Sequence, residues 1–506
     1  MRPVLRFTGF VDRVLWALWV ILLVTIPITS SPTVSALIGP TPVTPFSAVP
    51  LLGILVLLIL TRPSRLASLP RLAIPLLAFA WVACLASALA PWLRLFPFKG
   101  QTILAREIRG IATLAIGLGF YAAAILLPGN DERLRASLRW ITIGGIILLV
   151  WSSVQAFLLL HSSDPIPLEL QSAHRLLSIR DMVRGRVTGL AYEPSWLADQ
   201  LVMLYLPVWL ACTLRRYSAF RDRRTWFSLE AALLLWGSAI LFLSFSRIGL
   251  VAYVVVLGIV GIGVLWRQAS VGARRLSDTR RLASLPPSLV RIGIPALGVV
   301  FLALAAGLTM VFAGRLDWRI GLVFQLDLKG ALAEARFPVL YGLASRLAYA
   351  ERVMYWVAAS RVFDLHPLLG VGLGNSGHLF RSTVPAFGFY LPEIIQIANP
   401  GTPQFPNPKS LWLRLLAETG IVGFVLFAVW LLLIALTSWR ALRSEEPLPG
   451  VVGLASGMAL IALGIEGFSL DTFALPQLWI LFGLLTSLEP SSGKRRAWAA
   501  PAQGTR

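Results

Sequence analysis

The stretch LWLRLLAETGIVGFVLFAVWLLLIALT, residues 411–437, decides the class of fold. A helix needs about 20 mostly apolar residues to cross a bilayer, and this run is longer, with Arg414 and Glu418 as its charged residues. Further apolar runs of this kind lie near 13–29, 44–60, 72–90, 108–127, 139–160, 195–213, 226–245, 248–266, 292–313, 450–469 and 473–488. We therefore predict an all-α polytopic membrane protein with about twelve transmembrane helices.

The composition agrees with this prediction. Of the 506 residues 57% are hydrophobic and 14% are charged, and the mean hydropathy is +0.76, whereas soluble domains carry about 25% charged residues. The formal charge of +21 would suggest a nucleic-acid partner in a soluble protein. Here most arginines lie in short loops between apolar runs, so membrane orientation explains them and no nucleic acid is expected. The N-terminal run has no small-residue cleavage site after it, so we expect a retained first helix.

The basic loops predict how the chain is oriented. When the N-terminus is placed inside, every loop on that side carries arginine or lysine residues, as in TRPSRLASLPR (61–71) and RRYSAFRDRR (215–224). Cations gather on the cytoplasmic side of a membrane, so we expect a multi-pass protein of the bacterial inner membrane with both termini cytoplasmic. The expected parts are helices 1 to 9 in 1–313, a periplasmic loop 314–410, helices 10 to 12 in 411–488 and a cytoplasmic tail 489–506. A smaller outer loop is expected at 161–194.

The loop 314–410 is longer than ordinary connections, which points to function or to disorder. Its segment ALAEARFPVLYGLASRLAYAERVMYWVAASRVFDL (331–365) has apolar residues at helical spacing and spaced arginines, which predicts one amphipathic helix near the interface. HPLLGVGLG (366–374) breaks this helix, and its glycines would allow a close backbone approach or bend the chain back. The segment 382–409 is rich in Pro and aromatic residues and is expected to be an irregular lid.

Three outer cations are candidates for binding a lipid phosphate. Arg247 is the charge of the short turn SFSRIGL (244–250), where an arginine either snorkels to the interface or binds phosphate through two hydrogen bonds. Arg352 lies one helical turn before Trp356, and Lys409 has no nearby partner in the sequence. We predict that Arg247, Arg352 and Lys409 bind the same anion.

The other polar residues of the outer segments allow two readings. Arg414 and Glu418 have the i,i+4 spacing of a helical ion pair, which we expect to form. Glu193 precedes Pro194 at a helix start, where a carboxylate either favours the helix dipole or serves as a general base for a sugar hydroxyl. Both roles stay open for Glu193, and Asp199 is expected to pair with a nearby arginine. Arg186 and Tyr192 lie in the same segment.

Two histidines flank the glycine-rich break. His366 precedes Pro367 and fits a hydrogen bond at a helix end better than a base, and His378 follows the break. No strand precedes the glycines, so they are not a dinucleotide fingerprint. No acidic pair in the outer loops has metal-ligand spacing, and the two cysteines lie far apart in apolar runs. We therefore expect no metal and no other cofactor.

Four pieces of the sequence, in this order, resemble the O-antigen ligase and O-antigen polymerase superfamily. They are RVTGLAYEPSWLA (186–198), SFSRIGL (244–250), ERVMYW…HPLLGVGLGN (351–375) and SLWLRLLAETGIVGF (410–424). The resemblance implies about twelve spans, a large periplasmic loop, no metal or nucleotide requirement, and transfer of glycans carried on undecaprenyl pyrophosphate. Arg247 and Arg352 stand at positions that match the family's functional arginines.

One departure from the family pattern bears on the reaction. Ligases of this superfamily place a His before the LLAETG span, where this chain has Lys409 and Ser410. Glu193, Pro194 and Ser195 look more like the polymerases. We therefore expect a glycosyltransferase that polymerises undecaprenyl-pyrophosphate-linked repeat units, of O-antigen or exopolysaccharide, at the periplasmic face. A ligase acting on lipid A–core or another acceptor is the alternative, and a flippase for lipid-linked glycan is a third reading.

The expected roles follow from this reading. The catalytic candidates are Glu193, Arg247, Arg352 and Lys409. The substrate-binding candidates are Arg186, Tyr192, His366, His378 and Arg414. The expected partners are a polyprenyl-pyrophosphate-linked glycan donor, a lipid-linked glycan acceptor, membrane lipids and a chain-length regulator protein.

Overall fold

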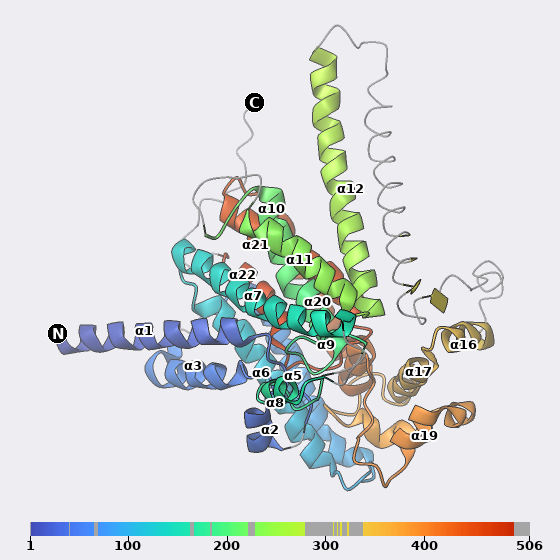
Figure 1. Cartoon of the computed structure of the whole chain (residues 1–506). Coiled ribbons are helices and arrows are strands. Elements are labelled where there is room, and N and C mark those ends of the chain that lie inside the picture. Colours follow the sequence, from blue (N-terminus) through green and yellow to red (C-terminus); the bar gives the residue numbers. More distant parts are fainter. Residues whose placement is uncertain are drawn as a thin grey trace. The chain divides into compact units, whose positions relative to one another are not determined.

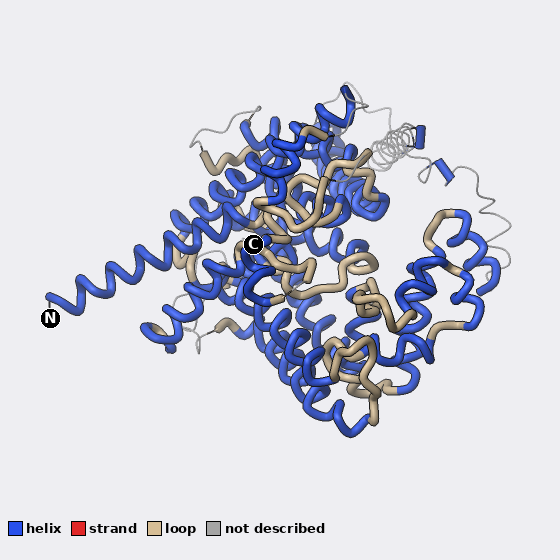
Figure 2. Tube along the Cα trace, turned by 60° about the horizontal axis from the view of Figure 1, so that its bottom comes forward, coloured by secondary structure: helices blue, strands red, loops and turns tan. Residues whose placement is uncertain are grey.

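A computed structural model describes residues 2–39, 41–64, 69–161, 166–182, 185–220, 228–278 and 337–489, with single positions between 307 and 322. It divides into two compact units, Met1–Ser246 with Glu351–Arg506, and Arg247–Ala350. Helices and loops form both units, and the described residues contain no strand beyond isolated bridges (Figures 1 and 2). The prediction of an all-α polytopic membrane protein is confirmed.

In the part of the chain that is described, seven segments are long and apolar enough to span a membrane. They are Arg71–Leu93, Ile103–Leu126, Asp131–Leu158, Pro194–Arg215, Arg247–Gln268, Leu411–Leu442 and Pro447–Glu466. Shorter apolar helices lie at Ala48–Thr61, Leu229–Leu243 and Pro476–Thr486. Each of these segments overlaps a predicted run. The run predicted at 292–313 and the tail beyond 489 fall almost wholly outside the described residues, so the total of twelve stays a prediction.

The first unit holds most of the helices. They are α1 (Arg2–Thr25), α2 (Pro32–Ile38), α3 (Ala48–Thr61), α5 (Ile74–Leu89), α6 (Ile103–Leu126), α7 (Asp131–His161), α8 (Leu168–Arg175), α9 (Pro194–Gln200), α10 (Leu206–Arg215), α11 (Leu229–Leu243), α17 (Ala350–Leu365), α18 (Phe380–Thr383), α19 (Pro392–Ala398), α20 (Leu411–Leu442), α21 (Pro447–Glu466) and α22 (Ile480–Thr486). A π-helical turn, η3 (Leu201–Tyr205), joins α9 to α10, and the short 3-10 turn η7 (Pro476–Leu478) precedes α22. The second unit holds α12 (Arg247–Asp278) and α16 (Phe337–Arg346).

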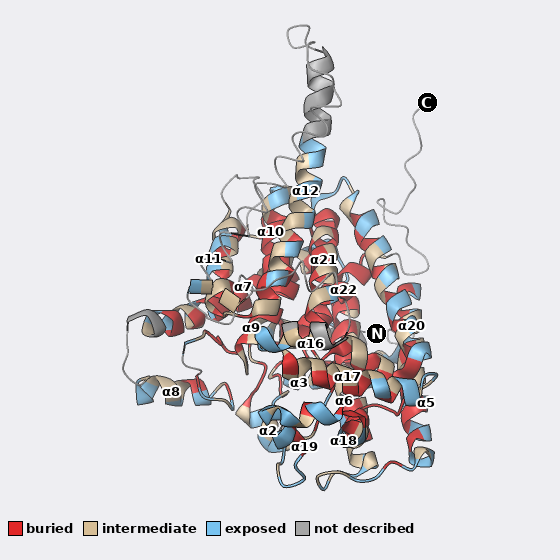
Figure 3. Cartoon of the chain, turned by 90° about the vertical axis from the view of Figure 1, so that its right-hand side faces the viewer, coloured by how far each residue is buried: buried red, intermediate tan, exposed pale blue. Residues whose placement is uncertain are grey.

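Within the first unit, α20 packs along α21 and α5, α10 packs on α21 and α11, and α22 packs on α6. Aromatic side chains fill the space between α20, α22 and α6. Trp430 lies at the centre, with ring centroids 5.2 Å from Phe427, 5.5 Å from Tyr121 and 5.6 Å from Trp479. These residues are buried, and Figure 3 colours the buried faces of the helices red. Such tilted and edge-on ring pairs stabilise helix packing beyond the area they bury.

The glycine-rich segment after α17 docks on a break in α20. At Gly420 the backbone of α20 leaves helical geometry, with φ 64° and ψ −170°. Four main-chain hydrogen bonds join the two backbones, from Val371 N to Ala417 O, Gly372 N to Glu418 O, Ile421 N to Pro367 O and Val422 N to Leu368 O. They occupy amide and carbonyl groups that a broken helix would leave unpaired in an apolar surrounding. We call this docked pair of segments, 367–372 and 417–422, the backbone interlock.

Glycine is required on both sides of the backbone interlock. Gly370 has φ 67°, and a Cβ there would lie 2.5 Å from the carbonyl carbon of Glu418. A Cβ on Gly420 would collide with the carbonyl group of Leu368. Both positions combine left-handed backbone geometry with a crowded neighbour. The close backbone approach predicted for the glycine-rich segment is therefore present.

Two predictions about the long loop are wrong. The helix expected over 331–365 is two helices, because α16 ends at Arg346 and α17 begins at Ala350, with Ala348 at φ 53° between them. A positive φ cannot continue a right-handed helix. Residues 331–336 lie outside the described part. The segment 382–409, expected to be irregular, contains the short helix α19.

The backbone interlock predicts the effect of adding a methyl group. Gly420→Ala is expected to lower the free energy of unfolding by at least about 1–3 kcal/mol, because the residue must hold a positive φ and also meets Leu368. Gly464→Ala in α21 is the control, since no atom lies within 4 Å of its Cβ, and it should be neutral or slightly stabilising. Thermal unfolding in detergent compares the two. Equal unfolding temperatures for the two variants would contradict the interlock.

Candidate functional site

Arg352 in α17 contacts the main chain of Lys409 before α20, and the predicted binding of one anion by both side chains stays a prediction. Arg352 donates through Nη1 to the carbonyl oxygen of Lys409 at 3.4 Å. Lys409 Nζ forms an ion pair with Glu393 at 2.8 Å and lies 4.8 Å from the centre of the Tyr355 ring. Arg352 is half-buried and forms no ion pair with any carboxylate in the described part of the chain. Its charge is therefore available to an anion.

The corner that carries Lys409 is held in place from α21. Lys409 has a left-handed backbone with φ 50°. The next residue, Ser410, caps α20 and donates its hydroxyl to the carbonyl of Gly467 at 3.1 Å, and Leu411 N donates to the same carbonyl at 2.7 Å. Gly467 has no room for a side chain, because the Trp412 ring lies against it. A strained residue such as Lys409 persists only where its surroundings fix it.

Glu393 and Tyr355 complete the surroundings of Lys409. The Tyr355 hydroxyl donates to Glu393 Oε1 at 3.0 Å, and the same oxygen accepts from Lys409. Burial would raise the pKa of Glu393, but the hydrogen bonds from Lys409 and Tyr355 outweigh it and lower the pKa. Burial and the neighbouring carboxylate raise the pKa of Tyr355. Neither residue was among the candidates predicted from the sequence, although Tyr355 follows Arg352 at the i,i+3 spacing of one helix face.

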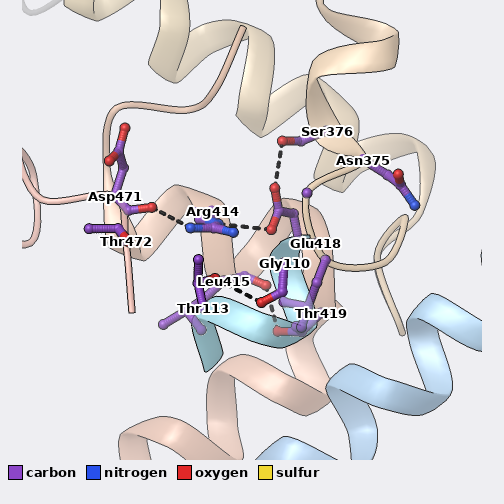
Figure 4. Close-up of polar contacts among 12 residues, drawn as sticks. Gly110, Thr113, Asn375, Ser376, Arg414, Leu415, Glu418, Thr419, Asp471 and Thr472 are labelled. Carbon is purple, nitrogen blue, oxygen red and sulfur yellow. Dashed lines mark hydrogen bonds and ion pairs between the residues drawn. The ribbon is translucent and has the colours of Figure 1, made fainter. Parts of the chain in front are cut away.

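Arg414, in the first turn of α20, is part of a buried network (Figure 4). Its Nε lies 2.9 Å from Glu418 Oε2, which confirms the predicted ion pair, and the two side chains are 11% and 3% exposed. Glu418 Oε1 accepts a hydrogen bond from Ser376 at 2.9 Å. Arg414 Nη1 donates to the main-chain carbonyl of Asp471. Arg414 thus fixes the position of the loop that follows α21, and its predicted contact with substrate stays a prediction.

Asp471 is a site candidate that the sequence analysis missed. Its carboxyl lies close enough to Arg414, Lys409, Arg352 and Glu193 for all four charges to act on it. These four residues come from separate segments of the chain. Burial raises the pKa of Asp471, and the three cations oppose this effect only in part. The signal in the sequence was a lone carboxyl in the short connection between the last two apolar runs.

Glu193 starts α9, with Pro194 as the first helical residue. Its Oε1 forms an ion pair with Arg180 at 2.8 Å, and its Oε2 accepts from the Ser195 hydroxyl at 3.3 Å. Arg180 also lies 5.2 Å from the centre of the Tyr192 ring. Both carboxylate oxygens of Glu193 therefore have protein partners. Its role as a base stays a prediction.

Asp199 does not pair with an arginine, so that expectation is wrong. Its carboxyl interacts with Glu466 at the end of α21, and the two residues are 1% and 0% exposed. Oδ1 of Asp199 and both carboxyl oxygens of Glu466 receive no hydrogen bond from a described donor. Two carboxyls can bond to each other only through a shared proton, and Arg352 is the cation whose charge reaches both. The π-helical turn that follows Asp199 is a feature frequent at functional sites.

Three other predicted residues have contacts outside this group. Arg186 donates to the carbonyls of Ser244 at 2.9 Å and of Phe245 at 3.1 Å, and so holds the end of α11. The His378 ring centre lies 5.0 Å from that of Phe405, and burial lowers the pKa of His378. His366 ends α17 with its main-chain N–H donating to Val362 at 3.1 Å, as expected for a residue at a helix end. Substrate contacts of all three stay predictions.

Arg247 belongs to the second unit, where it holds the end of α16. Its guanidinium donates to the carbonyls of Leu347 and, at 3.3 Å, of Ala348, and lies 4.1 Å from the centre of the Tyr349 ring. These contacts fix the chain just after the end of α16. The predicted role of Arg247 in binding phosphate stays a prediction. The described residues contain no group of three or more His, Cys, Asp and Glu that could hold a metal ion.

The buried network of Arg414 makes a prediction about stability. Arg414→Met should lower the free energy of unfolding by about 3–5 kcal/mol, because it leaves the Glu418 charge buried without its partner. The double variant Arg414→Met, Glu418→Leu should be more stable than the single variant, since no unpaired charge remains. Thermal unfolding of both proteins in detergent checks this order. A single variant as stable as the unmodified protein would show that the pair is not buried as described.

Comparison with known proteins adds the family. Residues 232–428 match the family model described as O-Antigen ligase. The matched part begins in α11 and ends in α20, and it includes Arg247, Arg352, Lys409 and the backbone interlock. The comparison with curated proteins found no match. This match over part of the chain is consistent with the O-antigen ligase and polymerase superfamily that its motifs resemble.

Proposed function

We propose that the protein is a membrane glycosyltransferase that polymerises undecaprenyl-pyrophosphate-linked repeat units, of O-antigen or exopolysaccharide, at the periplasmic face of the bacterial inner membrane. The family match supports a membrane enzyme of the ligase and polymerase type that acts on glycans. The observation that carries the proposal is the group of Arg352 and Lys409. A half-buried guanidinium without a carboxylate ion pair contacts the main chain of Lys409, whose ammonium group pairs with Glu393.

The chemistry of the donor explains why cations are needed. A hydroxyl of one repeat unit attacks the anomeric carbon of another, and the lipid diphosphate leaves as an anion. Cations fixed in advance where charge develops are an effective way to stabilise such a step. Arg352 offers a planar pair of N–H donors that matches phosphate oxygens, and Lys409 offers a point charge. Arg247 is the third proposed cation, and Glu193 is proposed to orient or deprotonate the acceptor.

Polymerisation is preferred over ligation because of two features. The position where ligases of the superfamily place a His holds Lys409 here, and its ammonium group pairs with Glu393 instead of acting as a neutral base. The start of α9 carries Glu193, Pro194 and Ser195, which look more like polymerases. The acceptor on this proposal is a second lipid-linked repeat unit. A ligase would use lipid A–core or another hydroxyl acceptor.

A reconstituted assay tests the proposal. Purified protein in liposomes, given labelled lipid-linked repeat units, should form a ladder of longer products. Arg352→Ala should slow ladder formation by about 10²–10³-fold, the loss seen when one donor to a developing anion is removed, without changing the unfolding temperature. Arg381→Ala is the matched control, because Arg381 is an exposed arginine of α18. An unchanged ladder with Arg352→Ala would remove this residue from the mechanism.

The choice of acceptor separates the alternatives in the same assay. A single transfer to lipid A–core without any ladder would make the protein a ligase. Exchange of labelled lipid across the bilayer without a new glycosidic product would make it a transporter.

A further inference from the structure

The carboxyl of Asp471 is left without a protein partner. Among the described residues it receives no hydrogen bond and forms no ion pair, although Asp471 is surrounded by protein and keeps partial exposure. Its main-chain carbonyl, in contrast, accepts a hydrogen bond from Arg414. Figure 4 shows the carboxyl pointing away from Arg414 while the carbonyl points toward it. The backbone of Asp471 is thus fixed by Arg414, and its carboxyl group points away from Arg414.

The residues that fix Asp471 lead back to the backbone interlock. Arg414 is oriented by Glu418, and Glu418 is held by Ser376 and by its place beside the break in α20. The Thr472 hydroxyl accepts a hydrogen bond from Ala474 N at 3.3 Å and holds the turn on the other side. A functional side chain needs such support to keep its geometry.

The charges around Asp471 suit a proton acceptor. Burial raises the pKa of its carboxyl and the neighbouring cations limit the rise, and a base works best when its pKa lies near the working pH. The same cations, Arg352 and Lys409, are proposed to hold the diphosphate. Glu193, the base expected from the sequence, has both oxygens engaged by Arg180 and Ser195. A carboxyl free of protein partners is better placed to meet a substrate hydroxyl.

We propose that Asp471 is the general base of the transfer and takes the proton of the attacking sugar hydroxyl. This inference rests on the proposed function. The hydroxyl oxygen forms a bond to the anomeric carbon, and the bond from that carbon to the diphosphate oxygen breaks. The electron pair leaves on the diphosphate, beside Arg352 and Lys409. The proton moves to an Asp471 carboxylate oxygen and is later released to water.

The test uses the full-length protein in the liposome assay with labelled lipid-linked repeat units. Asp471→Asn should lower kcat by about 10²–10⁴-fold, the usual contribution of a general base. In the unmodified protein the rate should rise with pH as the base loses its proton, and this rising limb should be absent in Asp471→Asn. Asp471→Glu should restore part of the rate. Asp364→Asn, in an exposed acid of α17, is the matched control and should behave as the unmodified protein.

Other outcomes overturn the inference. If Glu193→Gln abolishes the rising limb while Asp471→Asn keeps it, Glu193 is the base and Asp471 is not. If Asp471→Asn lowers the unfolding temperature in parallel with activity and Asp471→Glu gives no rescue, the role of Asp471 is structural. In these cases the unmodified protein still forms the ladder and the proposed function stands. If stable unmodified protein forms no product with any acceptor, both the proposed function and the role of Asp471 fall.

Discussion

The docking of the glycine-rich segment on the broken helix α20 is the constraint on which the site depends. Four main-chain hydrogen bonds connect the two segments, and they can form only because Gly370 and Gly420 leave no Cβ between the backbones. Helical spacing places Glu418 beside Arg414 in the turn before the break, and Arg414 holds the carbonyl of Asp471. An unpaired amide or carbonyl in an apolar surrounding costs several kcal/mol by order of magnitude, so the two segments support each other strongly.

The polar groups around this framework fall into two kinds. Arg414, Glu418 and Ser376 are occupied by one another and serve to hold the backbone. Arg352 and Asp471 have charges that no described partner neutralises directly. Burying a cation and a carboxyl without ion-pair partners lowers the stability of the folded protein. Such groups are found at functional sites, where a substrate supplies the missing partner. Two further buried carboxyls lie in spans, Asp199 in the span that contains the π-helical turn and Glu466 at the end of α21.

Much of the fold could be predicted from the sequence, because apolar runs of spanning length dominate it. The ion pair of Arg414 and Glu418 followed from local spacing, and the close approach at the glycines followed from their missing Cβ. Contacts between distant segments could not be predicted in this way. The neighbour of Asp199 is Glu466, which comes from another span, so spacing along the sequence could not reveal this contact. Arg180 forms its ion pair with Glu193 because the loop between them folds back. The main chain of Asp471 is held by Arg414, which lies more than fifty residues before it in the chain.

The central claim is that Arg352 and Lys409 bind a lipid diphosphate next to Asp471. The most direct measurement is a cryo-electron-microscopy map of the protein in a lipid nanodisc with undecaprenyl pyrophosphate bound. The account predicts diphosphate density within hydrogen-bonding distance of Arg352 and Lys409, with the Asp471 carboxyl facing the same space. Diphosphate density bound elsewhere, with Arg352 and Lys409 in contact only with protein, would contradict it.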